Sequence, residues 1–422
     1  MYKKIIFSLI GIFMLPMFVS ASITPMAKIG NKYYDSLEEA ILNASSADTI
    51  MLVSDVVLED TLTINKEVNI NLNGNDITAP EKVFMIKGGF LDISGNGTIK
   101  ETSPNYGAIM LVGSSEVTND KYSSVHVGKD VTLEGWSGIF INHENSKSYG
   151  VNVYLDGKIN AVNDVNGGTG IGIYVNGNIK DEEAHPVVSI SDDALIKSTG
   201  NGLYIAGYST FYIGDAYIEG VESGIGIKSG KLIINGATVI GNGEDKTPTE
   251  GYNNGIKASG TAIQIESNNG YKGKIEIDIS RGNFISENSN VLYEYIGRGN
   301  QSLIYSMSIS GGNFVSNNGK EVFSFSDSFK DIHSGFISGG EYSSNPTEYL
   351  KSGYTTTKED SKYNVIKSTV KLVNSNSSKS NEPTFLKSLI SLIAIVALGI
   401  LTYINRVRIS NWLNKILNNF KK

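Results

Sequence analysis

Short runs of alternating apolar and polar residues recur along the middle of the chain, each followed by a Gly, Asp or Asn corner. About eight copies follow one another between Val125 and Ser344, at a repeat distance of roughly 20–40 residues. Examples begin at Val188 (VSISDDALIKSTGNGLYI), Phe211 (FYIGDAYIEGVESGIGI) and Met307 (MSISGGNFVSNNGKEVF). Period-two alternation predicts strands with one buried face. Self-similarity at this distance predicts that the strands stack as one solenoid rather than form separate domains.

The corners between these runs favour parallel pairing of the strands. Tandem hairpins need two-residue turns at regular places, whereas here the corners are irregular and equivalent runs recur one repeat later. Alternation puts Val68, Ile70 and Leu72 on one face of a predicted strand, and Asn73-Gly74 tolerates positive φ at the bend that follows. Residues 61–366 therefore predict a parallel β-helix, in which each coil pairs with the next.

Residues 27–60 predict an N-terminal cap and the first coil. Ser36 with Glu39 three residues later fits a capping box, and apolar residues at helical spacing continue through Ala44. A first strand is expected from Asp48. A short helix in front of the strands would cover the open end of a solenoid, which otherwise exposes core and unpaired backbone.

The first residues resemble a secretory signal, predicted to span residues 1–21. Lys3 and Lys4 supply a basic start, an apolar run follows, and small residues end at Ala21, where a signal peptidase could cleave. The alternative is an uncleaved N-terminal anchor, although the apolar run is short for a membrane span.

The C-terminal part predicts a membrane anchor. Residues 367–384 are rich in Ser and Asn and predict a flexible stalk. Residues 385–404 have the length and apolarity of a transmembrane helix. Arg406 and Arg408 follow at once, so the positive-inside rule places a basic tail, 405–422, in the cytoplasm. Two interpretations of the tail stay open: an interfacial amphipathic helix, and a segment that only fixes orientation.

Composition narrows the possible functions. The chain has 422 residues, 46 Gly and no Cys, which excludes disulfides, zinc–thiolate sites and Cys nucleophiles. Its formal net charge is −7, with 36 Lys and Arg against 43 Asp and Glu. Eight of the 36 basic residues lie in the two end segments, where no acidic residue occurs, so the middle carries 28 basic against 43 acidic residues. Neutralising phosphates needs clustered Lys and Arg, and we therefore predict no nucleic-acid partner.

Two stretches of the chain carry a family resemblance. One is KYYDSLEEAILNASSADTIMLVSDVVLEDTLTI from Lys32, and the other is ISGGEYSSNPTEYLKSGYTTTKEDSKYNVI from Ile337. Together with the repeats, they resemble adhesin-like surface proteins of Gram-positive bacteria within the pectate-lyase-like superfamily. The resemblance covers residues 27–366. It implies an all-β, right-handed parallel β-helix and no particular activity. The short N-terminal capping helix and the C-terminal transmembrane helix are predicted from the sequence patterns given above.

The chemistry of that superfamily is poorly matched here. Its lyases combine a calcium-binding Asp cluster with an Arg or Lys base. Arg281 and Arg298 are the only arginines between the end segments, and Arg281 takes the corner position that Gly311 holds in a sister repeat. Asp192-Asp193, the only adjacent aspartates, also fall at a corner. The paired carboxylates of a glycosidase must instead flank one bond.

Hydrolase and metal signals are weak as well. The superfamily's hydrolases carry Gly-His-Gly and Arg-x-Lys motifs, whereas residues 200–202 read Gly-Asn-Gly and no Arg-x-Lys occurs. The scattered histidines are His126, His143, His185 and His333. Asn163, Asp164 and Asn166 could supply oxygen ligands for calcium, although polar inserts often have this composition. We predict no catalytic residue, no metal site and no cofactor.

Tyrosines are frequent in the middle repeats, and equivalent outward positions of a solenoid stack into ladders. The set comprises Tyr149, Tyr154, Tyr174, Tyr204, Tyr208, Tyr212, Tyr217, Tyr252, Tyr271, Tyr293 and Tyr295. Within it, Tyr174, Tyr204, Tyr212 and Tyr217 are the candidate ligand-binding residues, because aromatic ring faces stack on sugars. The alternative is cross-strand packing that only stabilises the sheet.

The sequence as a whole predicts a non-catalytic cell-surface protein, held in the membrane by its C-terminal helix with its body outside the cell. Its elongated face would serve adhesion, binding glycans or other host or cell-surface ligands. One alternative is a polysaccharide lyase or glycoside hydrolase of the superfamily. Another is a spacer that binds nothing.

Overall fold

We describe a computed structural model of the chain. It describes residues 24–368 except 103–105, 117–121, 163, 165–167, 181–184 and 246–259. The chain divides into two compact units, Met1–Ser368 and Thr369–Lys422, and all described residues belong to the first. The predicted signal, transmembrane helix and basic tail, and nearly all of the stalk, lie outside the described residues. Within the described part, no helix has the length and apolarity needed to cross a membrane.

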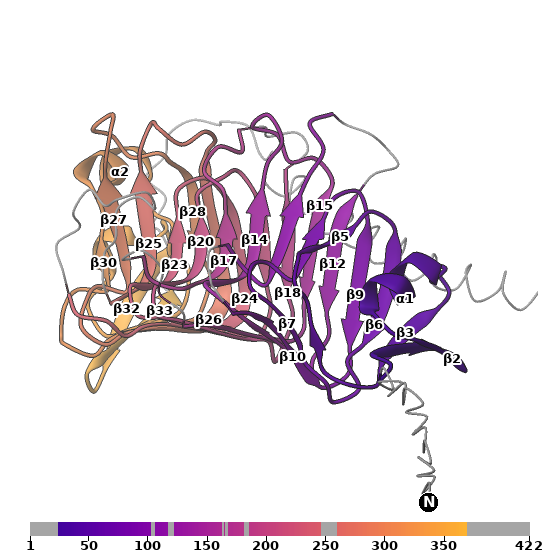
Figure 1. Ribbon diagram of the computed structural model, residues 1–422. Helices are drawn as coiled ribbons and strands as arrows, with labels where there is room; N and C mark the ends of the chain where they lie inside the picture. The colour runs from indigo at the N-terminus through magenta and orange to yellow at the C-terminus, as the bar shows by residue number, and fades with distance from the viewer. Residues whose placement is uncertain are drawn as a thin grey trace, which may run out of the picture. The chain divides into compact units, whose positions relative to one another are not determined.

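The described part is all-β and is built from coils that each contribute one strand to each of three faces (Figure 1). The first face is β3 (Thr49–Leu52), β6 (Glu67–Asn71), β9 (Phe90–Ser94), β12 (Ser123–Val127), β15 (Val151–Leu155), β18 (Val187–Ile190), β21 (Thr210–Ile213), the starts of β24 (Gly230–Gly241) and β26 (Ile275–Ser286), and β28 (Ile304–Ile309). The second face is β4 (Val56–Val57), β7 (Ile77–Ala79), β10 (Gly97–Glu101), β13 (Val131–Glu134), β16 (Lys158–Ala161), β19 (Leu195–Ser198), β22 (Tyr217–Gly220), the ends of β24 and β26, β29 (Asn313–Ser316) and β31 (Glu341–Tyr342). The third face is β5 (Leu62–Ile64), β8 (Phe84–Ile86), β11 (Ile109–Val112), β14 (Ser137–Asn142), β17 (Ile171–Val175), β20 (Asn201–Ile205), β23 (Ser223–Ile227), β25 (Thr261–Ser267), β27 (Leu292–Ile296) and β30 (Phe323–Ser324).

Strands within each face pair in parallel with the equivalent strand of the next coil. β15 pairs with β18, and β18 with β21, on the first face; β17 pairs with β20, and β20 with β23, on the third. The third face is a separate 10-stranded sheet, while the first two faces belong to one 23-stranded sheet. The prediction of long parallel sheets with one strand set per coil is confirmed, and the arrangement is consistent with a parallel β-helix.

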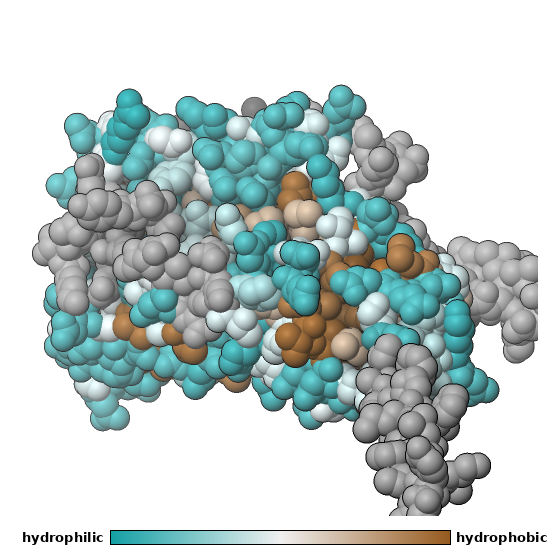
Figure 2. All heavy atoms as spheres, viewed as in Figure 1, coloured by the Kyte–Doolittle hydropathy of each residue, from teal (hydrophilic) through white to brown (hydrophobic). Residues whose placement is uncertain are grey.

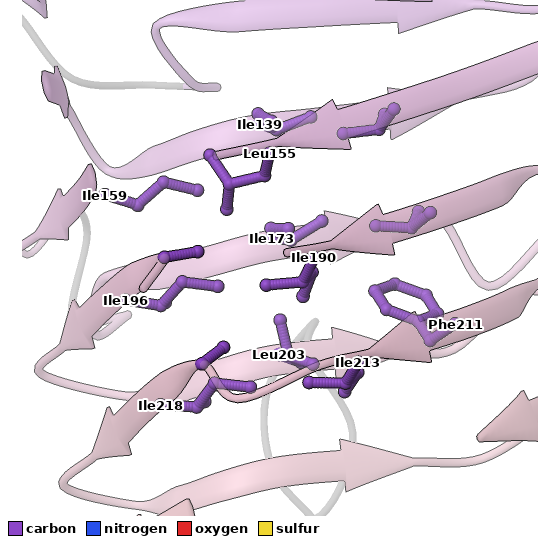
Figure 3. Close-up of a cluster of buried hydrophobic side chains, with 14 of the residues drawn as sticks. Ile139, Leu155, Ile159, Ile173, Ile190, Ile196, Leu203, Phe211, Ile213 and Ile218 are labelled. Carbon is purple, nitrogen blue, oxygen red and sulfur yellow. The ribbon is translucent and has the colours of Figure 1, made fainter. Parts of the chain in front are cut away.

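The core is a set of aligned apolar rows that run from coil to coil (Figure 3). The rows drawn there are Leu155, Ile190 and Ile213 from the first face, Ile159, Ile196 and Ile218 from the second, and Ile139, Ile173 and Leu203 from the third. All of them are at most 2% exposed. Burying each such side chain stabilises the fold by about 1.5–3 kcal/mol, so stacked rows can replace disulfides as the source of stability.

Glycines in the strands of the third face allow the second face to pack against the backbone there. A Cβ on Gly138 would lie 2.5 Å from Ile159 Cγ2, and one on Gly202 would lie 2.5 Å from Ile218 Cγ2. Both glycines lie inside strands, β14 and β20, rather than at corners. These two glycines therefore allow close packing and do not turn the chain.

Both ends of the coil stack carry other structure. At the N-terminal end, β1 (Ala27–Ile29) pairs antiparallel with β2 (Lys32–Tyr34) and with β3, and the predicted helix is α1 (Leu37–Asn43). The Ser36 hydroxyl accepts a hydrogen bond from Glu39 N–H at 3.1 Å, as the capping prediction requires. At the C-terminal end lie α2 (Asp327–Ile332), a 3₁₀ turn η1 (Thr347–Tyr349), and an antiparallel hairpin of β32 (Tyr354–Glu359) and β33 (Lys362–Lys367).

Corner positions follow the predicted turn chemistry. Asn73 and Gly74 have φ of 51° and 84°, and Asp193 has φ of 70°. Val68, Ile70 and Leu72 are all fully buried, as alternation predicts. The Asn73 side-chain amide donates to the carbonyl of Leu52 in the preceding coil at 3.0 Å, so this corner also joins successive coils.

Candidate functional site

The outward side of the third face carries a stack of aromatic rings. Strand register aligns Met110, Phe140, Tyr174 and Tyr204 in successive coils. The Phe140 and Tyr174 ring centroids are 4.6 Å apart, and those of Tyr174 and Tyr204 are 4.9 Å apart, both pairs being stacked. Trp136 packs beside Tyr174 with its ring centroid at 5.7 Å. These residues form an aromatic ladder outside the coil core.

The ladder is mostly hidden from solvent. Trp136 and Phe140 are each 8% exposed, and Tyr204 is 4% exposed. Burial raises the pKa of Tyr174, and it raises the pKa of Tyr204 well above the ordinary value for tyrosine. A sugar ring can stack only on an accessible ring face. The geometry of the ladder therefore supports the alternative in which the tyrosines pack across strands and stabilise the sheet.

The ladder continues into a buried ion pair. Lys228 contacts Glu266, and the side chains of both are 2% exposed. The Lys228 Nζ lies 4.8 Å from the Tyr204 ring centroid and 5.2 Å from that of Tyr271. Burial lowers the pKa of Lys228, against the opposing charge of Glu266. The residues around this pair leave no space in which a water molecule would fit.

The first face presents its outward side chains differently. Register aligns Tyr154, Ser189 and Tyr212 in three successive coils. Tyr154 is 46% exposed and Tyr212 is 44% exposed, while the residues on either side of each point into the core. On the side of the molecule drawn in Figure 2, which includes parts of more than one face, the surface is mostly hydrophilic, and apolar surface is gathered in a compact area.

Next to Tyr154 in the same row, a histidine is held between two carboxylates. His126 Nδ1 lies 2.7 Å from Asp92 Oδ1, and its Nε2 lies 2.9 Å from Asp156 Oδ2. The hydrogen bond to Asp92, reinforced by Asp156, raises the pKa of His126 to about 9 despite partial burial. The ring is therefore an imidazolium at neutral pH, and it donates to both carboxylates.

A surface hollow adjoins this row where the first face turns toward the second. It has a volume of about 400 Å³ and is lined by Lys129, Asp156, Ser191 and Asp192. Asp156 follows Tyr154 by two residues, just beyond the end of β15. Exposed rings and a polar hollow thus lie next to each other on the first face.

The four predicted tyrosines fall on three different faces. Tyr174 and Tyr204 stack together on the third face. Tyr212 lies on the first face, and Tyr217 lies on the second, where its hydroxyl donates to Glu219 Oε2 at 2.8 Å. One ligand therefore cannot contact all four along a single row. Tyr154, which belongs to the wider tyrosine set, is the other exposed ring in the row of Tyr212, two coils away.

The candidate catalytic residues lie in structural contacts. Arg281 donates through both terminal nitrogens to Asp215, at 3.0 and 3.1 Å, and through Nε to Asn235 Oδ1 at 3.0 Å. It sits where the register between β24 and β26 shifts, as its corner assignment predicts. Asp192 Oδ1 accepts the Asp215 N–H at 2.8 Å, so this carboxylate also holds a corner.

Of the three candidate metal ligands, Asp164 is the one that lies among the described residues, and it holds local structure. Asp164 Oδ1 accepts hydrogen bonds from Thr199 Oγ1 at 2.6 Å and from Gly170 N–H at 3.1 Å. Asn163 and Asn166 lie outside the described residues. Across 24–368, less the gaps given above, no three His, Asp or Glu side chains are grouped as a metal ion would need.

Comparisons with known proteins do not assign the chain to a family. No protein-family model, no curated protein and no solved structure matches the chain. The first and third faces differ in the exposure of their aromatic rings: Tyr154 and Tyr212 on the first face are 46% and 44% exposed, whereas Phe140 and Tyr204 on the third are 8% and 4% exposed.

Proposed function

We propose that the chain is a non-catalytic cell-surface protein that displays one face of a parallel β-helical rod for glycan binding. The observation that carries this proposal is the exposed row of Tyr154, Ser189 and Tyr212, next to a polar hollow of about 400 Å³. Ligand sites commonly combine aromatic surface with a few placed polar groups. Tyr154 and Tyr212 are 46% and 44% exposed, so a sugar in solution can reach part of each side chain.

The proposal includes the handedness, family and location of the rod. We propose a right-handed β-helix of the pectate-lyase-like superfamily, supported by the repeats and the two terminal stretches quoted above. Export through residues 1–21, a transmembrane helix at 385–404 and a cytoplasmic tail at 405–422 are supported by the sequence. Protease treatment of intact cells tests this topology: it should remove the rod, and a rod that survives only until the cells are lysed would contradict it.

The alternative function is a polysaccharide lyase or hydrolase, and the hollow is the observation in its favour. A catalytic groove should join three or more carboxylates, or carboxylates with an arginine. The lining holds two carboxylates, Asp156 and Asp192, with Lys129. Arg281 is committed to Asp215 and Asn235. This arrangement supports binding over turnover.

A glycan panel separates the candidate functions. The full-length chain, purified in detergent, is screened for binding to a broad set of polysaccharides and for release of reducing or unsaturated sugars from them. Binding without release is expected. Turnover on any member would establish the enzyme instead, and a chain that binds nothing on the panel would have the properties of a spacer.

A further inference from the structure

The first face offers two exposed rings at a fixed spacing along the coil stack. Tyr154 and Tyr212 are separated by one intervening coil, in which Ser189 occupies the same position. Strands in a sheet are about 4.8 Å apart, so the two rings are about 10 Å apart. Because serine is small, it raises no barrier between them. A polysaccharide that runs along the stack can place alternate sugar rings on the two tyrosines.

The hollow beside Tyr154 has a negative balance of charge. Lys129 Nζ lies 3.1 Å from Asp193 Oδ2, so this ammonium is paired within the protein. The single charge of the His126 imidazolium is shared between Asp92 and Asp156.

Asp192 lines the same hollow, and its Oδ1 accepts a hydrogen bond from the Asp215 N–H. Among the described residues, no cation pairs with this carboxylate. The hollow and the adjoining His126 clamp, formed by His126 between Asp92 and Asp156, thus carry more carboxylates than cations. Such a site repels a uronate polymer and attracts a cationic one, since like charges brought together disfavour binding.

We propose, on the basis of the glycan-binding function above, that Tyr154, Tyr212 and the adjoining hollow bind an extended polysaccharide with free amino groups. The sugar rings stack on the two tyrosines, and the ammonium groups face Asp156 and Asp192. An ammonium group is also attracted to the face of a tyrosine ring. Such a ligand is opposite in charge to acidic pectin-type polymers.

Three oligosaccharide probes of equal length test the ligand class with the full-length chain. They are β-linked oligomers of glucosamine, the same oligomers N-acetylated, and oligogalacturonate. We expect the glucosamine oligomer to bind about tenfold or more tighter than its N-acetylated form, with oligogalacturonate weakest. Added salt should reduce the difference. Equal binding of the two glucosamine forms, or tightest binding of oligogalacturonate, overturns the proposal.

Substitutions test the site itself. Tyr154→Ala with Tyr212→Ala should weaken glucosamine-oligomer binding about tenfold or more, because aromatic anchors dominate binding energy. Asp192→Asn retains an oxygen for the Asp215 N–H and should reduce the preference for the amino form. Tyr33→Ala is the matched control, since Tyr33 is 57% exposed and lies in β2 of the N-terminal cap. Circular dichroism confirms that each variant is folded.

The outcomes distinguish this site from the broader function. If the chain binds glycans and the double tyrosine variant binds them equally well, the site is wrong while the proposed function stands. If the wild-type chain binds no member of a broad panel, both fail. Loss of binding in Tyr33→Ala equal to that in the double variant also contradicts the site.

Discussion

The first and third faces share one interior and differ in what they turn outward. Inward, both present unbroken apolar rows, such as Leu155 and Ile190 on one and Ile173 and Leu203 on the other. Outward, the third face buries an aromatic ladder and an ion pair, whereas the first face exposes tyrosines over polar groups. The interior therefore determines that the coils stack, and the outward rows determine what each face can do.

The difference has an energetic consequence that can be measured. Side chains that are buried on the outward side of a face contribute to stability as core residues do, because removing them leaves cavities or unpaired charges. Removing an exposed group lowers the stability of the fold only a little, because water replaces the contacts of that group. Variants of the two faces should therefore separate by several kcal/mol in the free energy of unfolding, even where the same residue type is changed.

The largest effect is expected at the buried ion pair. Lys228→Ala leaves Glu266 buried without its cation and should lower the free energy of unfolding by about 3–5 kcal/mol. Urea denaturation followed by circular dichroism measures it. Lys129→Ala is the control: its pair with Asp193 has side chains 70% and 73% exposed, and it should cost at most about 1 kcal/mol. Equal losses in the two variants would show that the faces do not differ.

A smaller effect is expected in the aromatic ladder. Tyr174→Leu keeps an apolar side chain but removes stacking on both Phe140 and Tyr204. Each stacked pair is worth about 0.5–1.5 kcal/mol beyond its buried area, so the loss should be about 1–3 kcal/mol. The same denaturation measurement applies, with Tyr212→Leu on the first face as the matched substitution. A loss at Tyr212 as large as that at Tyr174 would contradict the packing role assigned to the ladder.

The His126 clamp gives the first face a dependence on pH. Its folded pKa, about 9, lies above the value of 6.5 for an unperturbed histidine. Its stabilising contribution is therefore complete below about pH 6.5 and is lost as the pH rises through 9. The side chain is 33% exposed, so solvent screening reduces the contribution to about 1–2 kcal/mol.

Unfolding of the wild type and of His126→Gln across pH 6 to 10 measures this contribution, because the difference between the two proteins isolates the clamp. NMR titration of the imidazole gives the pKa directly. A difference that grows toward high pH, or an imidazole pKa near 6.5, would contradict the clamp.

Much of the architecture was predictable from local sequence. Alternation at Val68, Ile70 and Leu72 predicts a strand with one buried face, and Asn73-Gly74 predicts the bend after it; both are confirmed. These features depend on neighbouring residues alone. Glycine was harder to interpret, because Gly202 lies within a strand under Ile218 rather than at a corner, and that contact joins two faces of the coil.

The site was not predictable to the same extent. It depends on the register in which the strands of successive coils pair, and on which other segments bury the outward side chains. His126 meets Asp92 and Asp156, which are 34 and 30 residues away in the sequence, and only the pairing of three coils brings them together. Tyr174 and Tyr212 both alternate with apolar neighbours, so each is expected to point outward. Whether that outward position is covered depends on segments distant in the sequence, and local pattern carries no information about them.

The smallest effect on stability is expected where the proposed function is concentrated. Tyr212→Ala should change the free energy of unfolding by no more than about 0.5 kcal/mol, since the ring is 44% exposed and its neighbours Phe211 and Ile213 keep the core intact. The same variant should lose glycan affinity. A binding residue on a rigid sheet can be removed without loss of the sheet, whereas a packing residue cannot. A loss of more than about 2 kcal/mol, as core truncations give, would place Tyr212 with Tyr174 as a structural ring and leave the first face without its distinguishing property.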